Sequence, residues 1–142
     1  MPDSFSSEVS NVLDQLLQRE RAVDRDREAR KQAWKEAVWA FREIAREAIL
    51  PTLRDVEEPL RARGWSPLLA DNSRFGLTVG LDVERDGSDP RTLCFRLDTD
   101  RKAIDALVLG PGDPIAQGTI ALAEADLPWV RRTVLAFLDR LG

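Results

Sequence analysis

Residues 75–98, FGLTVGLDVERDGSDPRTLCFRLD, decide the fold of this chain because they predict a β-hairpin. Apolar side chains fall on every second position of both arms, which is the period of a strand with one buried face. The alternating apolar positions are Leu77, Val79, Leu81 and Val83 in the first arm and Leu93, Phe95 and Leu97 in the second. Asp86-Gly87 lies between the arms and is a turn signal. We therefore expect two antiparallel strands joined within 85–90.

Three further strands are expected around the hairpin. Residues 65–70 predict a weak first strand, because Pro67 cannot donate a ladder hydrogen bond. Residues 103–109 and 117–123 predict two more, with the turn sequence Gly-Pro-Gly-Asp-Pro at 110–114 between them. Strands joined by short turns pair as an antiparallel meander. We therefore expect a meander of four to five strands.

The last segment of the chain predicts a helix with one apolar face. Asp126 is a suitable N-cap, because its carboxylate can accept a hydrogen bond from the first turn. The apolar positions of this helix are Leu127, Val130, Val134, Phe137, Leu138 and Leu141. Such a face is expected to pack on one side of the sheet.

The residues before Gly64 have the period of a helix. A first apolar stripe consists of Val9, Val12, Leu13, Leu16 and Leu17. Residues 19–31 interrupt the stripe with charged side chains. The stripe resumes at Trp34, Val38, Phe41, Ala45, Ala48 and Ile49. Because no Gly or Pro occurs between Ser7 and Leu50, we expect one helix of roughly 40 residues.

Two residues are expected to change or end this helix. Pro51 removes one hydrogen bond and clashes with the preceding turn, so it predicts a kink or a restart. Pro59 predicts a second kink or a short loop. Gly64 is a natural C-terminal cap.

These elements predict an α+β fold with a long N-terminal helix kinked near Pro51, a four- to five-stranded antiparallel meander and a C-terminal helix packed on one sheet face. The two-layer domain is expected over residues 33–142, with residues 1–32 as a helical extension. An apolar stripe left in water is unfavourable. We therefore expect self-association through residues 8–32, although the charged middle leaves fewer than three clean heptads for a coiled coil. The alternative is that the extension folds back on its own chain.

Composition excludes several classes of function for these 142 residues. The chain has no histidine, which excludes His-based triads, His metal sites and His acid–base catalysis. Its single cysteine, Cys94, excludes an intrachain disulfide and paired-thiolate zinc sites.

The net charge of the chain is −4, and its sequence contains no basic stripe of the kind that binds nucleic acid. No apolar run approaches the length of a membrane span. Residues 1–10, with Asp3 and Glu8, lack the basic region of a secretory signal. We expect a cytoplasmic protein that binds neither nucleic acid nor membrane.

The best candidate for chemistry is an acidic group formed by Asp82, Glu84, Asp98 and Asp100. Asp82 and Asp98 lie on neighbouring strands, where two close carboxylates could hold magnesium for hydrolysis. The order of elements is similar to nuclease cores that carry acidic residues on a hairpin. Those cores place a lysine two residues after the second acid, whereas Asp100 stands at that position here. The alternative is a solvated sheet face on which Arg96 neutralises Asp82. We assign no family, no catalytic, cofactor-binding or metal-ligating residue, and no cofactor.

Cys94 is an outward position of the hairpin by its alternation. No imidazole exists to lower its pKa, so we expect a small apolar filler rather than a reactive thiol.

Four tryptophans could form core edges or meet a partner. Trp34 and Trp39 lie five residues apart, so we expect one to face the sheet and the other to lie on the helix flank. Trp129 lies in the first turn of the last helix, beside Arg131 and Arg132. Trp39, Trp129, Arg131 and Arg132 form the predicted partner surface.

Three functions remain after these exclusions. The first is a non-catalytic assembly or adaptor protein that self-associates through the N-terminal helix and presents its α+β head to a protein partner. The second is a small-molecule or peptide carrier with an apolar cleft between helices and sheet, expected among Trp34, Phe41, Phe95 and Phe137. The third is a metal-dependent hydrolase that uses Asp82 and Asp98.

Overall fold

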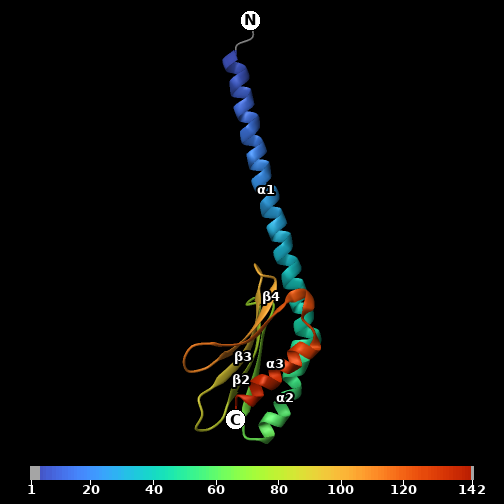
Figure 1. Cartoon of the computed structure of the whole chain (residues 1–142), viewed down its shortest axis with the longest axis vertical. Coiled ribbons are helices and arrows are strands. Elements are labelled where there is room, and N and C mark those ends of the chain that lie inside the picture. The colour runs from blue at the N-terminus through green and yellow to red at the C-terminus, as the bar shows by residue number, and fades with distance from the viewer. Residues whose placement is uncertain (1–3, 142) are drawn as a thin grey trace. The chain divides into compact units, whose positions relative to one another are not determined.

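The computed structural model describes residues 4–141 and has the α+β architecture that the sequence predicts (Figure 1). Its elements are α1 (Ser4–Ile44), the π-helical turn η1 (Ala45–Ile49), α2 (Leu50–Ala62), β1 (Ser66–Asn72), β2 (Thr78–Glu84), β3 (Arg91–Asp98), β4 (Ala103–Leu109), β5 (Ile115–Ala121), the 3₁₀ turn η2 (Leu122–Glu124) and α3 (Leu127–Asp139). The chain divides into two compact units, Met1–Lys35 and Glu36–Gly142, and the division falls within α1. Residues 1–3 of the predicted extension lie outside the described residues.

The first unit consists of the α1 residues up to Lys35. None of its described side chains is buried, and only Ala33 is half-buried. Arginine side chains brace the backbone, since Arg25 Nε donates to the Arg21 carbonyl at 3.4 Å and Arg30 Nε donates to the Asp26 carbonyl at 3.4 Å. The helical conformation therefore rests on local propensity and on contacts within one helix, which stabilise an isolated helix only slightly.

The second unit contains a five-stranded antiparallel sheet in the order β1-β2-β3-β4-β5. The predicted hairpin at 75–98 is confirmed as β2 and β3, with Leu81 opposite Leu93 and Val79 opposite Phe95. The first strand predicted at 65–70 is confirmed as β1, which contains Pro67 and lies at one edge of the sheet. The last strand begins and ends two residues earlier than predicted. It stops at Ala121 because Leu122 is buried in η2, where its N–H donates to the Lys102 carbonyl at 2.8 Å.

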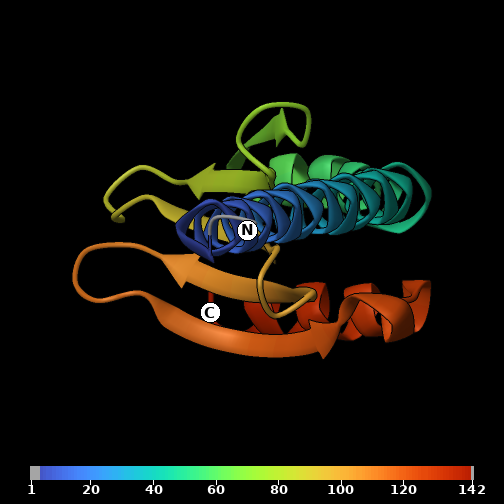
Figure 2. The same cartoon turned by 90° about the horizontal axis from the view of Figure 1, so that it is seen from above.

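Helices cover one face of this sheet. In Figure 2, α2 lies towards the β1 side and α3 towards the β5 side, and each helix contacts that strand. The core between the layers has no exposure at Phe41, Phe95 and Phe137. The C-terminal helix is therefore packed on the sheet, as the apolar face of residues 127–141 predicted.

The change of helix predicted at Pro51 is confirmed, and it takes the form of a π turn. The backbone N–H of Leu50 donates to the carbonyl of Ala45, five residues back. A proline cannot make the next helical hydrogen bond, and a wider turn accommodates its ring. Pro51 then lies in the first turn of α2, where a missing N–H costs little. Pro59 lies inside α2 without ending it.

Gly64 ends the long helical run, as its place in the sequence predicted. It has a φ of +85°, a conformation that costs other residues free energy. The N–H of Gly64 donates to the Arg61 carbonyl at 3.1 Å, and that of Trp65 donates to the Leu60 carbonyl at 3.0 Å. These two bonds form a Schellman motif, which turns the chain from α2 into β1.

Two expectations about the tryptophans of α1 are wrong. Trp34 does not belong to the buried stripe, since 49% of it is exposed, and the buried positions begin at Ala37. Trp39 is exposed as well, so neither side chain belongs to the core. Helical spacing alone could not show at which residue the buried positions of the stripe begin. Over residues 4–141, none of the helices combines the length and the apolar character that a membrane crossing needs.

Candidate functional surfaces

The apolar stripe predicted on the N-terminal helix is present and lies in solvent. Exposure ranges from 40% at Val9 to 63% at Val12, and Leu13, Leu16 and Leu17 lie between these values. Phe5 and Val23 are exposed large apolar side chains of the same helix. Single exposed apolar residues are ordinary on protein surfaces, but a contiguous set is typical of an interaction surface. The stripe is therefore the strongest candidate for an interface in the first unit.

Two exposed aromatic side chains characterise the second unit. Trp39 on α1 is 65% exposed, and Phe75 in the loop between β1 and β2 is 95% exposed. Arg42 fixes this loop to the helix, since its Nη2 donates to the Arg74 carbonyl at 2.8 Å and its Nε donates to the Ser73 carbonyl at 3.4 Å. The sequence analysis did not single out Phe75, although its polar neighbours Asp71–Arg74 and Gly76 could have marked it as a loop residue.

The structure divides the predicted partner surface. Asp126 caps α3 by accepting a hydrogen bond from the N–H of Trp129 at 2.9 Å. Trp129 is half-buried and meets Phe95 edge to face, with ring centroids 5.9 Å apart, so it belongs to the core edge. Arg131 and Arg132 are exposed on α3.

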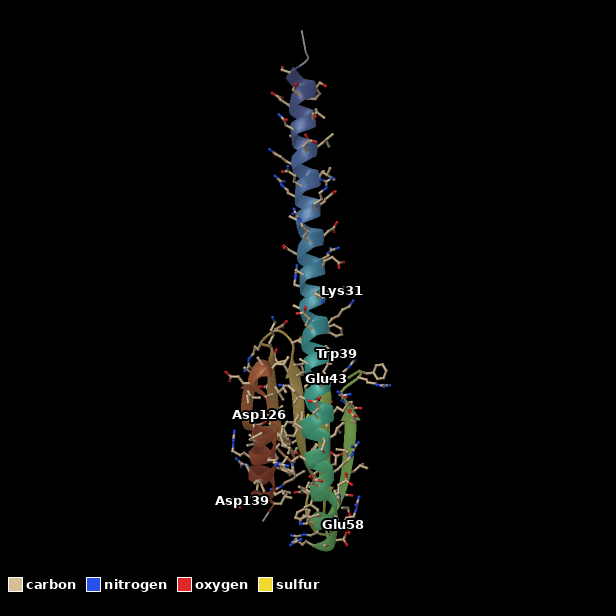
Figure 3. The ribbon with its side chains drawn as sticks, turned by 90° about the vertical axis from the view of Figure 1, so that its right-hand side faces the viewer. Lys31, Trp39, Glu43, Glu58, Asp126 and Asp139 are labelled. Atoms are coloured by element: carbon tan, nitrogen blue, oxygen red, sulfur yellow. The ribbon has the colours of Figure 1, made fainter. Side chains whose placement is uncertain are left out.

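Trp39 lies on a different helix from the other members of that surface. Figure 3 shows it on α1, whereas Asp126 and Asp139 mark the ends of α3. The four residues of the predicted partner surface share an aromatic or basic side chain, but the fold places them on two separate helices.

The predicted acidic site does not assemble. Asp82 lies opposite Thr92 in the hairpin and accepts a hydrogen bond from its hydroxyl, whereas Asp98 lies opposite Ala103. Six positions along β3 separate Thr92 from Asp98, which corresponds to about 20 Å. The expectation that Asp82 and Asp98 lie close together is therefore wrong. Over residues 4–141, no three acidic or cysteine side chains are grouped so that they could hold a metal ion.

A different aspartate forms a polar cluster on the face of the sheet that the helices do not cover, called the open face below. Asp105 on β4 is only 6% exposed, and its Oδ1 accepts a hydrogen bond from the Thr119 hydroxyl at 2.7 Å. Its carboxylate also pairs with Arg96 at 3.5 Å and with Arg101 at 3.6 Å. Arg96 therefore neutralises Asp105 rather than Asp82, which corrects the expected partner. The register Arg96–Asp105–Thr119 across three strands produces this cluster, and it could not be known before the pairing of β3, β4 and β5.

Cys94 is half-buried on the same face, opposite Gly80 on one side and Leu107 on the other. Burial raises the pKa of the Cys94 thiol, Arg96 lowers it and Asp82 raises it further, and the net shift is upward. The thiolate is the nucleophilic form of cysteine, so a raised pKa makes this thiol less reactive at neutral pH.

A cleft of about 500 Å³ lies in the second unit between the ends of α2 and α3. Figure 3 shows Glu58 near the end of α2 and Asp139 at the end of α3, at the same end of this unit. The apolar side chains that line the cleft are Val56, Pro59, Leu60, Trp65, Leu138 and Leu141. Arg63 and Arg85 complete the lining. This volume lies in the range of small-molecule sites.

The geometry of the two cleft arginines differs. The Cζ atom of Arg85 lies over the ring of Trp65, 4.3 Å from its centroid. Arg63 donates one hydrogen bond from Nη1 to the Pro59 carbonyl at 3.0 Å, and its remaining N–H groups are directed to no described carboxylate. Both residues are exposed, and over residues 4–141 neither forms a salt bridge.

The cleft is not where the sequence analysis expected one. Phe41, Phe95 and Phe137 are fully buried in a packed cluster, and Trp34 lies in solvent. The expectation of unfilled volume among them is therefore wrong. Comparison of the chain with protein-family models, with curated proteins and with solved structures found no match.

Proposed function

We propose that the protein is a non-catalytic assembly protein that self-associates through the N-terminal helix and presents its α+β unit to other molecules. The observation that carries this proposal is the exposure of Val9, Val12, Leu13, Leu16 and Leu17 in a unit that has no buried side chain over residues 4–35. Burial of apolar surface against another helix would remove the cost of leaving this stripe in water.

The width of the stripe favours a helical bundle over a two-stranded coiled coil. At about 100° per residue, the five positions from Val9 to Leu17 cover an arc of about 140°. A two-stranded coiled coil needs only the narrow a/d seam, whereas a wider stripe lets one helix contact two neighbours. Charged residues at 19–31 confine the apolar contact to the first part of the helix.

The charge distribution of the helix favours a second copy as the partner. Residues 4–17 contain two acidic and no basic side chains, a net charge of −2. Residues 18–35 contain seven basic and four acidic side chains, a net charge of +3. An antiparallel pair that keeps the two stripes in contact, with Leu13 of each copy opposite Leu13 of the other, would place Glu8 near Arg19 of the second copy, so the helix is complementary to itself. A parallel pair would place like charges together.

The proposal is tested by the solution mass of the full chain, measured by light scattering at tens of micromolar. We expect a dimer or higher oligomer for the natural chain and a monomer for the double variant Leu13→Asp/Leu16→Asp. The matched control is Asn11→Asp/Gln18→Asp, which adds the same charge on the opposite helix face. A natural chain that is monomeric at this concentration, or a control that dissociates as readily as the stripe variant, contradicts self-association through the stripe.

The orientation is tested by the distance between spin labels. A label at Arg25→Cys, in a Cys94→Ser background, would lie about 35–40 Å from its mate in an antiparallel pair that places Leu13 of one copy opposite Leu13 of the other. A parallel pair would hold the two labels within about 15 Å. A short distance would contradict the antiparallel arrangement and leave self-association intact.

We further propose that the α+β unit binds a protein partner at Trp39 and Phe75. Both aromatic side chains are exposed, and aromatic residues are enriched at interface centres. Cross-linking of the full chain is expected to capture a partner that Trp39→Ala/Phe75→Ala does not capture. The control Arg131→Ala, on α3, should capture it as the natural chain does. Equal capture by all three chains would contradict this surface.

A second candidate function is the binding of a small molecule, because the α+β unit has an apolar cleft of about 500 Å³. The metal-dependent hydrolase is not proposed further, since the hairpin register separates Asp82 from Asp98.

A further inference from the structure

We propose that the cleft between α2 and α3 binds an amphipathic monocarboxylate, a molecule with an apolar body and one carboxylate group. This inference rests on the small-molecule function and is independent of self-association, because every residue that lines the cleft belongs to the second unit.

The walls of the cleft select an apolar body. Val56 and Leu60 on α2 face Leu138 and Leu141 at the end of the chain, and the ring of Trp65 closes a third side. These side chains are half-buried or buried, so they are already held by packing against the core. A ligand that fills such a preformed apolar space gains free energy from the surface it removes from water.

The rim of the cleft selects an anion. Arg63 and Arg85 both line the cleft, and the other charged residues of residues 4–141 do not. A guanidinium has five N–H donors and is charged at every physiological pH. Arg63 uses one of its donors in the hydrogen bond to the Pro59 carbonyl. Arg85 contacts the Trp65 ring through a cation–π interaction, which uses no hydrogen-bond donor. Donors therefore remain on both side chains.

The apolar walls and the two arginines of the rim together favour a carboxylate with an apolar body over a neutral molecule or a small polyanion. A carboxylate matches the planar fork of arginine and can accept two parallel hydrogen bonds from it. A neutral lipid-like molecule would fill the apolar space and leave both cations without a partner. A small polyanion would satisfy the cations and leave the apolar walls in water.

The test compares three probes of equal chain length by isothermal titration calorimetry and by backbone amide shifts of the full protein. The probes are decanoate, decanol and decylammonium, each below its micelle concentration. We expect decanoate to bind at least about tenfold more tightly than decanol, as charge-assisted hydrogen bonds predict, and decylammonium to bind most weakly. The largest shifts should lie at the ends of α2 and α3.

Variants separate the roles of the walls and the rim. The double variant Arg63→Gln/Arg85→Gln should bind decanoate and decanol equally, and Arg131→Gln should keep the natural preference because Arg131 lies outside the cleft. The variant Val56→Trp, which fills the cleft, should weaken all three probes.

Two results overturn the inference in distinguishable ways. Equal binding of decanoate and decanol to the natural chain refutes the carboxylate preference and leaves a cleft for apolar ligands. The absence of binding by all three probes up to the solubility limit of each, or shifts confined to other surfaces, refutes the small-molecule function itself. Neither result bears on the solution mass, which tests self-association.

Discussion

Replacing the buried carboxylate of Asp105 should lower the free energy of unfolding more than any other single change on the open sheet face. Asp105 is 6% exposed and accepts a hydrogen bond from Thr119 at 2.7 Å. A hydrogen bond to a charged group contributes about 1.5–3 kcal/mol. The ion pairs to Arg96 and Arg101 involve side chains that are more than half exposed, so each contributes less than about 1 kcal/mol. We expect Asp105→Ala to cost about 2–3 kcal/mol.

The variant Asp105→Asn separates the two contributions. Asparagine keeps an oxygen for the Thr119 hydroxyl and loses the charge that faces the two arginines, so it should cost about 1 kcal/mol. High salt should lower the cost of both variants by a similar amount, because both lose the charge and only that part is screened. Urea denaturation of both variants measures these values, with Asp100→Ala, which replaces an exposed aspartate of the turn between β3 and β4, as the control. An Asp105→Ala cost below about 0.5 kcal/mol, or an Asn variant as unstable as the Ala variant, would refute the reasoning.

Four further outcomes follow from single residues. Gly64→Ala should cost about 1 kcal/mol in urea denaturation, because the φ of +85° strains alanine although a Cβ has room there. Asp126→Ala should cost about 1 kcal/mol in the same assay, through loss of the α3 cap; a cost near zero would mean that water replaces the cap. Cys94 should react with iodoacetamide at pH 8.5 more slowly than a cysteine peptide and at the peptide's rate in urea, because burial raises its pKa. Two hydrogen bonds from Ser73 lower the pKa of Asp71 below 3.8, so its stabilising effect is complete above that pH and is lost as the pH falls through the folded-state pKa. An NMR titration midpoint at or above 3.8 would contradict the last of these.

The fold could be predicted because each element carries its own local signal. The period of two in residues 75–98 fixes which side chains of the hairpin face the core, and a slip of one residue would reverse them all. Gly64 and Asp126 mark helix ends through backbone requirements that act within one turn. These signals need no knowledge of the partner element, so they survive in a single sequence.

The candidate cleft could not be predicted because its residues come from separate parts of the chain. Trp65 lies between α2 and β1, Arg85 directly follows β2 and Leu138 belongs to α3, and only the packing of α2 and α3 over the sheet brings them together. The same reason explains the error about Asp82 and Asp98, since the carboxylate separation depends on the register of pairing. Trp34 was misplaced because the apolar periodicity of α1 extends beyond its buried positions, which begin at Ala37.

The strands at the two margins of the sheet have a consequence for the behaviour of the protein at high concentration. Unpaired backbone groups at a sheet margin can recruit a strand from another molecule and start fibrillar aggregation. Pro67 removes a donor from β1, and the register shift between Ala106 and Leu107 breaks the regular ladder beside β5. Both margins are therefore poor templates for an added strand. We therefore expect concentrated solutions of the protein to resist fibrillar growth through the sheet.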